Sequence, residues 1–150
     1  MPTYYIDPDS EGGDGSTTAL TGANAALRLW PNMSEAGSTW LGRGGSNIVL
    51  TNAREIQAAN ITIGSYGTGK CTIDGRELST SITKSIRVSG VDNPTIENII
   101  FLAGPGSASS NSIIVGQVSQ ITGLTITDCE IYETFYAPTV QGSTNGISFP

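Results

Sequence analysis

The feature that most constrains the fold is a recurrence of apolar positions at one sequence offset. Ile96–Phe101 and Ile121–Ile126 carry apolar residues at three matching positions, and 121 − 96, 124 − 99 and 126 − 101 all equal 25. Ile61–Ile63 and Ile86–Val88 match at the same offset, and later spacings are longer. Constant strands joined by turns of variable length indicate structural repeats that stack on one another.

The runs between the turns are short, rich in β-branched residues and often alternate apolar with small polar residues. The expected strands are Thr3–Ile6, Thr39–Leu41, Asn47–Leu50, Asn60–Ile63, Cys71–Asp74, Ser85–Ser89, Ile96–Leu102, Ser112–Val115, Leu124–Tyr132 and Gly146–Phe149. We therefore predict an all-β chain folded as a right-handed parallel β-helix, a solenoid, because crossover connections are nearly always right-handed. An antiparallel sandwich also has many short strands, but it does not need a fixed offset.

The repeat also predicts which strands and side chains come together. Ile61–Ile63, Ile86–Val88 and Ile113–Val115 are expected to stack in parallel in one sheet. The side chains expected in one narrow core are Ile63, Ile73, Val88, Ile99, Phe101, Leu124, Ile126 and Cys129.

A single helical pattern occurs, between Thr17 and Trp30. Its apolar face consists of Leu20, Ala23, Leu27 and Trp30. Thr21 is suited to an N-cap and Pro31 would end the helix. We predict a capping helix that covers the open end of the stack. Residues 1–38 then form a strand, an acidic turn loop and this cap, and residues 39–150 form β-helix coils that we expect to continue beyond the end of the chain.

The amino-acid composition disfavours several classes of function. Only 20 of 150 residues are charged, 7 basic and 13 acidic, so the net charge is −6, and there is no His. Without a basic cluster, binding to nucleic acid is disfavoured. No signal-peptide pattern is present, and the apolar runs are too short to span a bilayer. Cys71 and Cys129 are expected to be free buried thiols.

Two segments carry a family resemblance. The first is Tyr4–Pro8 with Gly13-Asp-Gly15, followed by Gly37–Leu41; the second is Ile61–Gly69 leading to Thr72–Gly75. Together they resemble the opening coils of the pectate-lyase-like β-helix superfamily. This resemblance implies the fold but no single activity, because the superfamily hosts lyases, hydrolases, epimerases, adhesins and phage tailspikes.

Direct initiation at Met1 without a signal further resembles phage virion proteins. The resemblance implies a structural virion component, extracellular once released: a tailspike, tail fibre or head-surface fibre. The expected partners are copies of itself, as a trimer, or other virion proteins, with contact to cell-surface polysaccharide. The alternatives are a polysaccharide lyase or glycoside hydrolase whose active site lies outside this stretch, and a secreted adhesin or lyase that has lost its signal.

The acidic loop DPDSEGGDGS is a candidate calcium site. It offers Asp7, Asp9, Glu11 and Asp14, and calcium prefers such oxygen ligands. The position that should carry a bidentate carboxylate is Thr18, so the pattern is incomplete. The alternative is that these side chains cap local backbone N–H groups in turns. We therefore expect no cofactor, and calcium on these side chains is the alternative.

Asp128 and Glu130 are the candidate catalytic pair. They flank Cys129 and should project outward on one face, with Asp74 a third candidate on a neighbouring coil. Paired carboxylates are the groups that glycoside hydrolysis uses. The alternative is that they are solvated side chains of a polar sheet. Motifs of pectate lyases and polygalacturonases are absent from this stretch, so the interpretation leans away from an enzyme.

Aromatic residues give the candidate contact surface. Tyr132, Phe135 and Tyr136 lie in or beside the long turn Glu133–Thr144, where they suit stacking on a sugar or packing on a neighbouring subunit.

Overall fold

The computed structural model describes residues 1–78, 84–88, 90–103, 112–116, 121–133 and 147–148. These residues form thirteen β-strands and no α-helix. The predicted all-β class is therefore confirmed.

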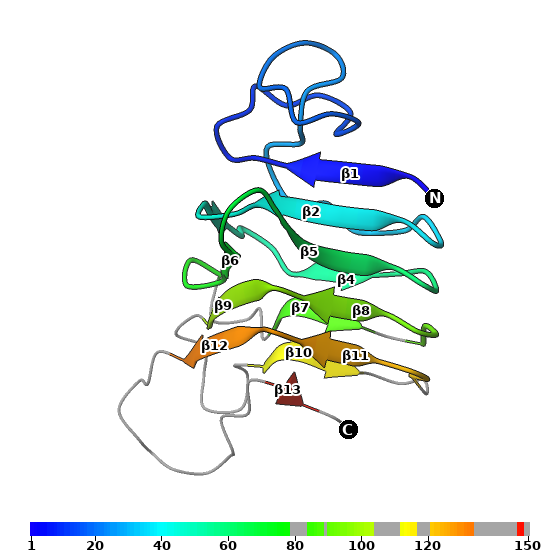
Figure 1. Ribbon diagram of the computed structural model, residues 1–150. Helices are drawn as coiled ribbons and strands as arrows, with labels where there is room; N and C mark the ends of the chain where they lie inside the picture. Colours follow the sequence, from blue (N-terminus) through cyan, green and yellow to red (C-terminus); the bar gives the residue numbers. More distant parts are fainter. Residues whose placement is uncertain (79–83, 89, 104–111, 117–120, 134–146, 149–150) are drawn as a thin grey trace.

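The strands form three sheets, and every pair is parallel (Figure 1). Sheet A consists of β1 (Thr3–Ile6), β2 (Thr39–Arg43), β5 (Thr62–Tyr66), β8 (Thr95–Glu97) and β11 (Thr125–Thr127). Sheet B consists of β4 (Arg54–Ile56), β7 (Lys84–Val88), β10 (Ser112–Gly116) and β13 (Ile147–Ser148). Sheet C consists of β3 (Asn47–Val49), β6 (Cys71–Asp74), β9 (Ile99–Ala103) and β12 (Glu130–Glu133). Parallel pairing throughout these strands contradicts the antiparallel sandwich.

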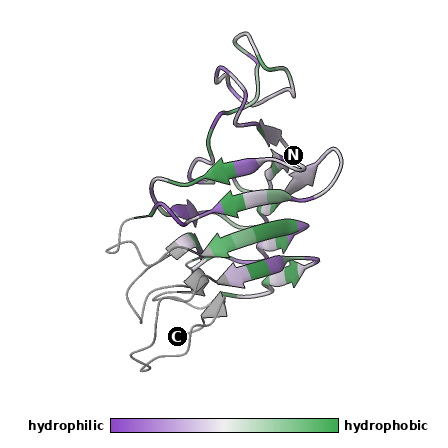
Figure 2. Ribbon diagram, turned by 90° about the vertical axis from the view of Figure 1, so that its left-hand side faces the viewer, coloured by the Kyte–Doolittle hydropathy of each residue, from purple (hydrophilic) through white to green (hydrophobic). Residues whose placement is uncertain are grey.

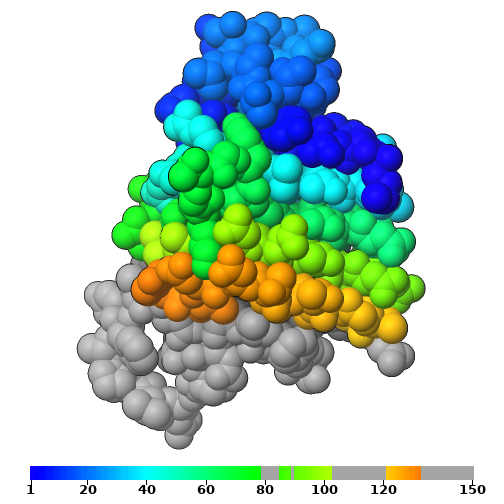
Figure 3. All heavy atoms as spheres, in the orientation of Figure 1, coloured from blue at the N-terminus to red at the C-terminus, as the bar shows by residue number. Residues whose placement is uncertain are grey.

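After β1 the chain visits the sheets in one repeated order, A then C then B. We call each such pass a rung: β2–β3–β4, β5–β6–β7, β8–β9–β10 and β11–β12–β13. In the space-filling view the rungs form successive layers in chain order (Figure 3). Strands that are neighbours in a sheet are therefore one whole rung apart in sequence.

The register corrects the predicted repeat. Ile86–Val88 and Ile113–Val115 do lie in neighbouring strands, since Ile86 pairs with Ile114 in sheet B. Ile61–Ile63 does not join them, because β5 belongs to sheet A. In sheet A the offset from Thr39 to Thr62 is 23 and from Thr62 to Thr95 is 33. Because the turns differ in length, the offset of 25 residues matched strands that belong to different sheets. Ile63 of β5 and Val88 of β7, for example, lie in sheets A and B.

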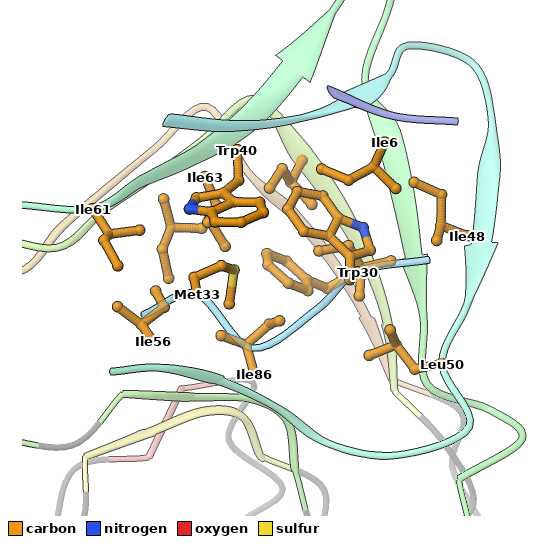
Figure 4. Close-up of a cluster of buried hydrophobic side chains, with 14 of the residues drawn as sticks. Ile6, Trp30, Met33, Trp40, Ile48, Leu50, Ile56, Ile61, Ile63 and Ile86 are labelled. Carbon is orange, nitrogen blue, oxygen red and sulfur yellow. The ribbon is translucent and has the colours of Figure 1, made fainter. Parts of the chain in front are cut away.

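Alternate side chains of each strand point inward, and across the register they form the columns of the core. One column of sheet A is Tyr4, Trp40, Ile63, Ile96 and Ile126. Sheet C has one column that includes Ile48, Ile73, Phe101 and Ile131 and another that includes Cys71 and Ile99. Hydrophobic strand segments follow one another down the stack (Figure 2), and their side chains meet in its interior (Figure 4). Alternation along each strand sends the next residue to the outer surface.

The predicted core is confirmed for five of its eight members. Ile63, Ile73, Val88, Ile99 and Phe101 are fully buried. Leu124, Ile126 and Cys129 are half-buried and only border the core, so their predicted full burial was wrong. All three belong to the last rung, which has a described neighbour on one side only.

Each turn that leads into one of the strands β2, β5, β8 and β11 of sheet A has a residue in the left-handed conformation at the same position. Gly37, Asn60, Asn93 and Gly123 all have positive φ, and each stands two residues before the same threonine position of its strand. Gly and Asn tolerate this conformation better than other residues. The Asn93 side-chain amide donates a hydrogen bond to Asn60 Oδ1 over 3.2 Å, so consecutive turns also bond to each other.

The predicted helix from Thr17 to Trp30 is wrong, because this segment is irregular. Its backbone carbonyls accept hydrogen bonds from the acidic loop instead: Asp14 N donates to Ala23 O over 2.9 Å, and Gly15 N donates to Ala25 O over 2.8 Å. Gly13 permits this approach, since a Cβ there would lie 2.4 Å from Ala25 N. Long-range pairing has overridden local helix propensity.

The end of the stack is nevertheless covered by this part of the chain. Trp30 and Met33 are fully buried: Trp30 lies beside Ile6, Ile48 and Leu50, and Met33 lies beside Ile56 and Ile86 (Figure 4). Met33 bridges to Ile56 of β4, and Leu27 bridges to Ile6 of β1. Leu20, predicted to line the apolar face of the helix, is 42% exposed.

Candidate functional site

The largest group of predicted site residues lies where sheet A turns into sheet C. We call Lys70, Asp128, Glu130 and Tyr132 the Lys70 cluster. Lys70 precedes β6, Asp128 occupies the turn between β11 and β12, and Glu130 and Tyr132 belong to β12. Ile131 pairs with the buried Phe101 and faces the core, so its two neighbours project outward.

One ammonium group bridges both candidate carboxylates. Lys70 Nζ lies 2.9 Å from Asp128 Oδ1 and 3.0 Å from Glu130 Oε1. The Tyr132 hydroxyl donates a hydrogen bond to Glu130 Oε2 over 2.9 Å. Asp128 can occupy the turn because Asp tolerates its positive φ of 50°. The two carboxylates were predicted to lie on one face, but their partner Lys70, almost two rungs away in the chain, was not predicted.

The electrostatics of the cluster favour charged, paired groups. Hydrogen bonds from Lys70 and then from Tyr132 hold the pKa of Glu130 below its usual range. Hydrogen bonds to Asp128 and Glu130 raise the pKa of Lys70. A general acid for glycoside hydrolysis needs a carboxyl whose pKa is raised, so that it is protonated near neutral pH. Glu130 is shifted in the opposite direction.

Asp74 lies apart from this cluster, in a polar network of its own. Its carboxylate is buried, accepts 2.9 Å and 2.7 Å hydrogen bonds from Arg76 Nε and Nη2, and accepts one from Asn47 Nδ2 over 3.0 Å. Burial opposes ionisation, but these hydrogen bonds together outweigh it and lower the pKa of Asp74. The predicted third carboxylate is therefore an ion-pair partner held two rungs from Tyr132 in the register of sheet C.

The acidic side chains of the loop pair with Arg43 and form hydrogen bonds within local turns. Asp7 is buried, and its Oδ2 lies 3.1 Å from Arg43 Nη1, while Asp9 Oδ2 lies 2.5 Å from Arg43 Nη2. Asp7 Oδ1 accepts a hydrogen bond from Asp9 N, and Asp14 Oδ1 accepts one from Ser16 N, as turn-forming residues do. Within the described ranges no three His, Cys, Asp or Glu residues gather as a metal site would require.

Arg43 and Tyr66 are the members of this second network that sequence reasoning missed. The Tyr66 hydroxyl donates to Asp7 Oδ2 over 3.5 Å, and its ring packs edge-on against Tyr5. Burial and then the negative charge of Asp7 raise the pKa of Tyr66 to about 12. Through Arg43 of β2 and Tyr66 of β5, this network connects the N-terminal loop to the first two rungs. The acidic side chain of Asp7 therefore has a structural role.

Of the three predicted contact aromatics, the structure describes one. Tyr132 is 55% exposed, whereas Phe135 and Tyr136 lie outside the described residues. Both cysteines are free, as predicted, although only Cys71 is fully buried. Burial raises the pKa of the Cys71 thiol to about 11, so it stays protonated and unreactive at neutral pH.

Comparisons of the chain with protein-family models, with curated proteins and with solved structures return no match. Among the residues that the structure describes, no helix is long and apolar enough to cross a membrane.

Proposed function

We propose that the three-sheet stack is a right-handed parallel β-helix and that the chain is a structural component of a virion, such as a tailspike, tail fibre or head-surface fibre. The observation that carries this proposal is the repeated A–C–B order of parallel strands, which pairs each strand with the equivalent strand of the next rung. Such stacking makes a stiff, elongated scaffold, because every rung bonds to its neighbours along its length.

The ion pairing and the pKa values of the carboxylates support a scaffold over an enzyme. Each candidate catalytic carboxylate is paired with a cation: Asp128 and Glu130 with Lys70, and Asp74 with Arg76. Active sites usually hold groups whose pKa is shifted toward the operating pH, whereas the pKa of Glu130 and of Asp74 is lowered. The alternative, a polysaccharide lyase or hydrolase, would require an active site outside this stretch.

The proposed scaffold works as a homo-oligomer, with a trimer as the expected form, and contacts host-surface glycan through the region around Tyr132. Its exposed ring and the adjacent charged groups offer the combination of apolar face and hydrogen-bonding groups that sugars require.

Turnover assays on the whole chain test this proposal. We expect no release of reducing ends or unsaturated products from neutral or acidic polysaccharides, with or without calcium. The matched variants are Asp128→Asn, which changes the Lys70 cluster, and Asp92→Asn, which changes an exposed carboxylate elsewhere. Turnover that is lost in the first variant and kept in the second would overturn the structural proposal in favour of the enzyme.

A further inference from the structure

Sheet A carries a column of identical side chains on its outer face. Its five strands place threonine at one register position, in the order Thr3, Thr39, Thr62, Thr95 and Thr125. The residue after each threonine belongs to the inward column of Trp40 and the isoleucines, so the threonines point outward. Neighbouring members are about 4.8 Å apart, the spacing of paired strands. We call this column the threonine ladder. Sheet A faces the viewer in Figures 1 and 3, which share one orientation.

The ladder has hydrogen-bonding capacity that the described chain leaves unused. Within the described residues, none of the five hydroxyl groups makes a hydrogen bond. Four of the threonines are half-buried and Thr125 is exposed. Each hydroxyl can both donate and accept, and each side chain also offers a methyl group. The ladder is therefore a regular, uncharged strip that suits a hydrogen-bonding partner.

The three sheets differ in charge. In sheet A the charged strand residues are Arg43 and Glu97, and Arg43 is paired with Asp7 and Asp9. Glu97 lies in the adjacent outward column, where its Cγ would be 3.3 Å from a Cβ built on Gly64, so it folds over that glycine. Sheet B by contrast carries Arg54 and the Glu55–Arg87 ion pair, and sheet C carries Asp74 and Glu130, which pair with Arg76 and Lys70.

This difference matters for association between identical chains. When parallel copies surround an axis along the stack, each residue near the axis faces the same residue of its neighbours. A charged column would then repel itself, whereas a hydroxyl column is complementary to itself because every member is both donor and acceptor. The threonine ladder meets this requirement along all five strands of sheet A.

We propose that the threonine ladder is the surface through which copies of this chain associate, in parallel and around an axis that runs along the stack. This inference rests on the homo-oligomer of the proposed function and specifies its interface. The asparagines beside the ladder extend the same chemistry, since Asn60 and Asn93 of neighbouring rungs already bond to each other.

Single cysteine substitutions test the arrangement on the whole chain. Disulfides need Cα atoms within about 7 Å of each other, so they form only where copies meet. In the parallel arrangement Thr39→Cys, Thr62→Cys and Thr95→Cys each join chain to chain under mild oxidation. In an antiparallel pair only Thr62→Cys, at the centre of the ladder, would do so. The control is Thr72→Cys, a half-buried outward threonine of sheet C, and all variants carry Cys129→Ser.

A charge substitution gives an independent readout. Thr62→Lys should raise the protein concentration at half dissociation by more than about tenfold, because like charges would meet at the axis. Thr72→Lys should leave it unchanged. Mass is measured by light scattering, and circular dichroism checks that both variants keep the wild-type fold.

The outcomes separate this inference from the proposed function. A wild-type chain that is monomeric at all concentrations overturns the homo-oligomer itself. An oligomer that survives Thr62→Lys, or that cross-links through Thr72→Cys but not through the ladder, overturns the ladder interface alone. If Thr62→Lys lost polysaccharide binding while the mass of the oligomer stayed unchanged, the ladder interface would also be overturned. The ladder would then be a surface that binds polysaccharide.

Discussion

Ile63 and Ile126 occupy the same inward column of sheet A, but they differ in enclosure. Ile63 lies between Trp40 and Ile96 in the register and is fully buried, whereas Ile126 has a described neighbour, Ile96, on one side only and is half-buried. Truncating each to alanine is therefore a matched test of how burial changes along the stack.

The expected losses follow from the carbons that each substitution removes. Isoleucine to alanine deletes three carbons, and about 0.8 kcal/mol of transfer free energy per buried carbon amounts to about 2.4 kcal/mol. At Ile63 a cavity term adds to this, because rungs on both sides hold the space open, so we expect a loss of about 3–5 kcal/mol. At Ile126 much of the side chain already meets solvent, and we expect about 1–2 kcal/mol.

The assay is equilibrium unfolding in guanidinium chloride at one protein concentration for all variants. A shift of the midpoint at constant slope measures the change in the free energy of unfolding. Equal losses at the two positions would refute the reasoning, because they would mean that the column is enclosed alike at Ile63 and at Ile126.

Three further predictions concern particular residues. The unfolded chain loses the Tyr66 proton near pH 10, but burial and the charge of Asp7 raise the pKa of Tyr66 to about 12 when folded. Stability present below pH 10 should thus fall as the pH rises toward 12, and Tyr66→Phe should make this fall in the denaturation midpoint smaller; an equal fall in Tyr66→Phe would contradict the raised pKa. Asn98 has a φ of 53°, so Asn98→Ala should cost about 1–2 kcal/mol in thermal unfolding, and a loss as large in Asn98→Gly would contradict a backbone cause. Gly13→Ala should cost about 1–3 kcal/mol and speed proteolysis of the N-terminal loop, because its Cβ would lie 2.4 Å from Ala25 N; an unchanged cleavage rate would contradict that clash.

Much of the local structure was predictable from the sequence. Short β-branched runs and Gly or Asn turns indicated strands, and the described strands β2, β3, β5 and β6 overlap the predicted ranges. Period-two alternation identified inward residues such as Ile63 and Phe101, because the side-chain direction in a strand depends only on position along it.

The candidate site was predictable only in part. Asp128, Glu130 and Tyr132 do gather on one surface, since alternation along β12 places Glu130 and Tyr132 on the same side. Lys70 and Arg43 were missed, because their partners lie 58 and 36 residues away in the chain, as 128 − 70 and 43 − 7 give. No local pattern links residues at such distances.

Local sequence patterns were enough to specify an all-β chain of short strands, many of the residues that face inward, and the turns that need Gly or Asn. The tertiary structure was needed to establish which strands are neighbours. The rungs differ in length, so the register is fixed only when all three sheets pair at once. The tertiary structure also decided that residues 17–30 pair with the acidic loop instead of forming a helix. Propensity contributes only tenths of a kcal/mol per residue, whereas burying Trp30 and Met33 over the end of the core contributes several.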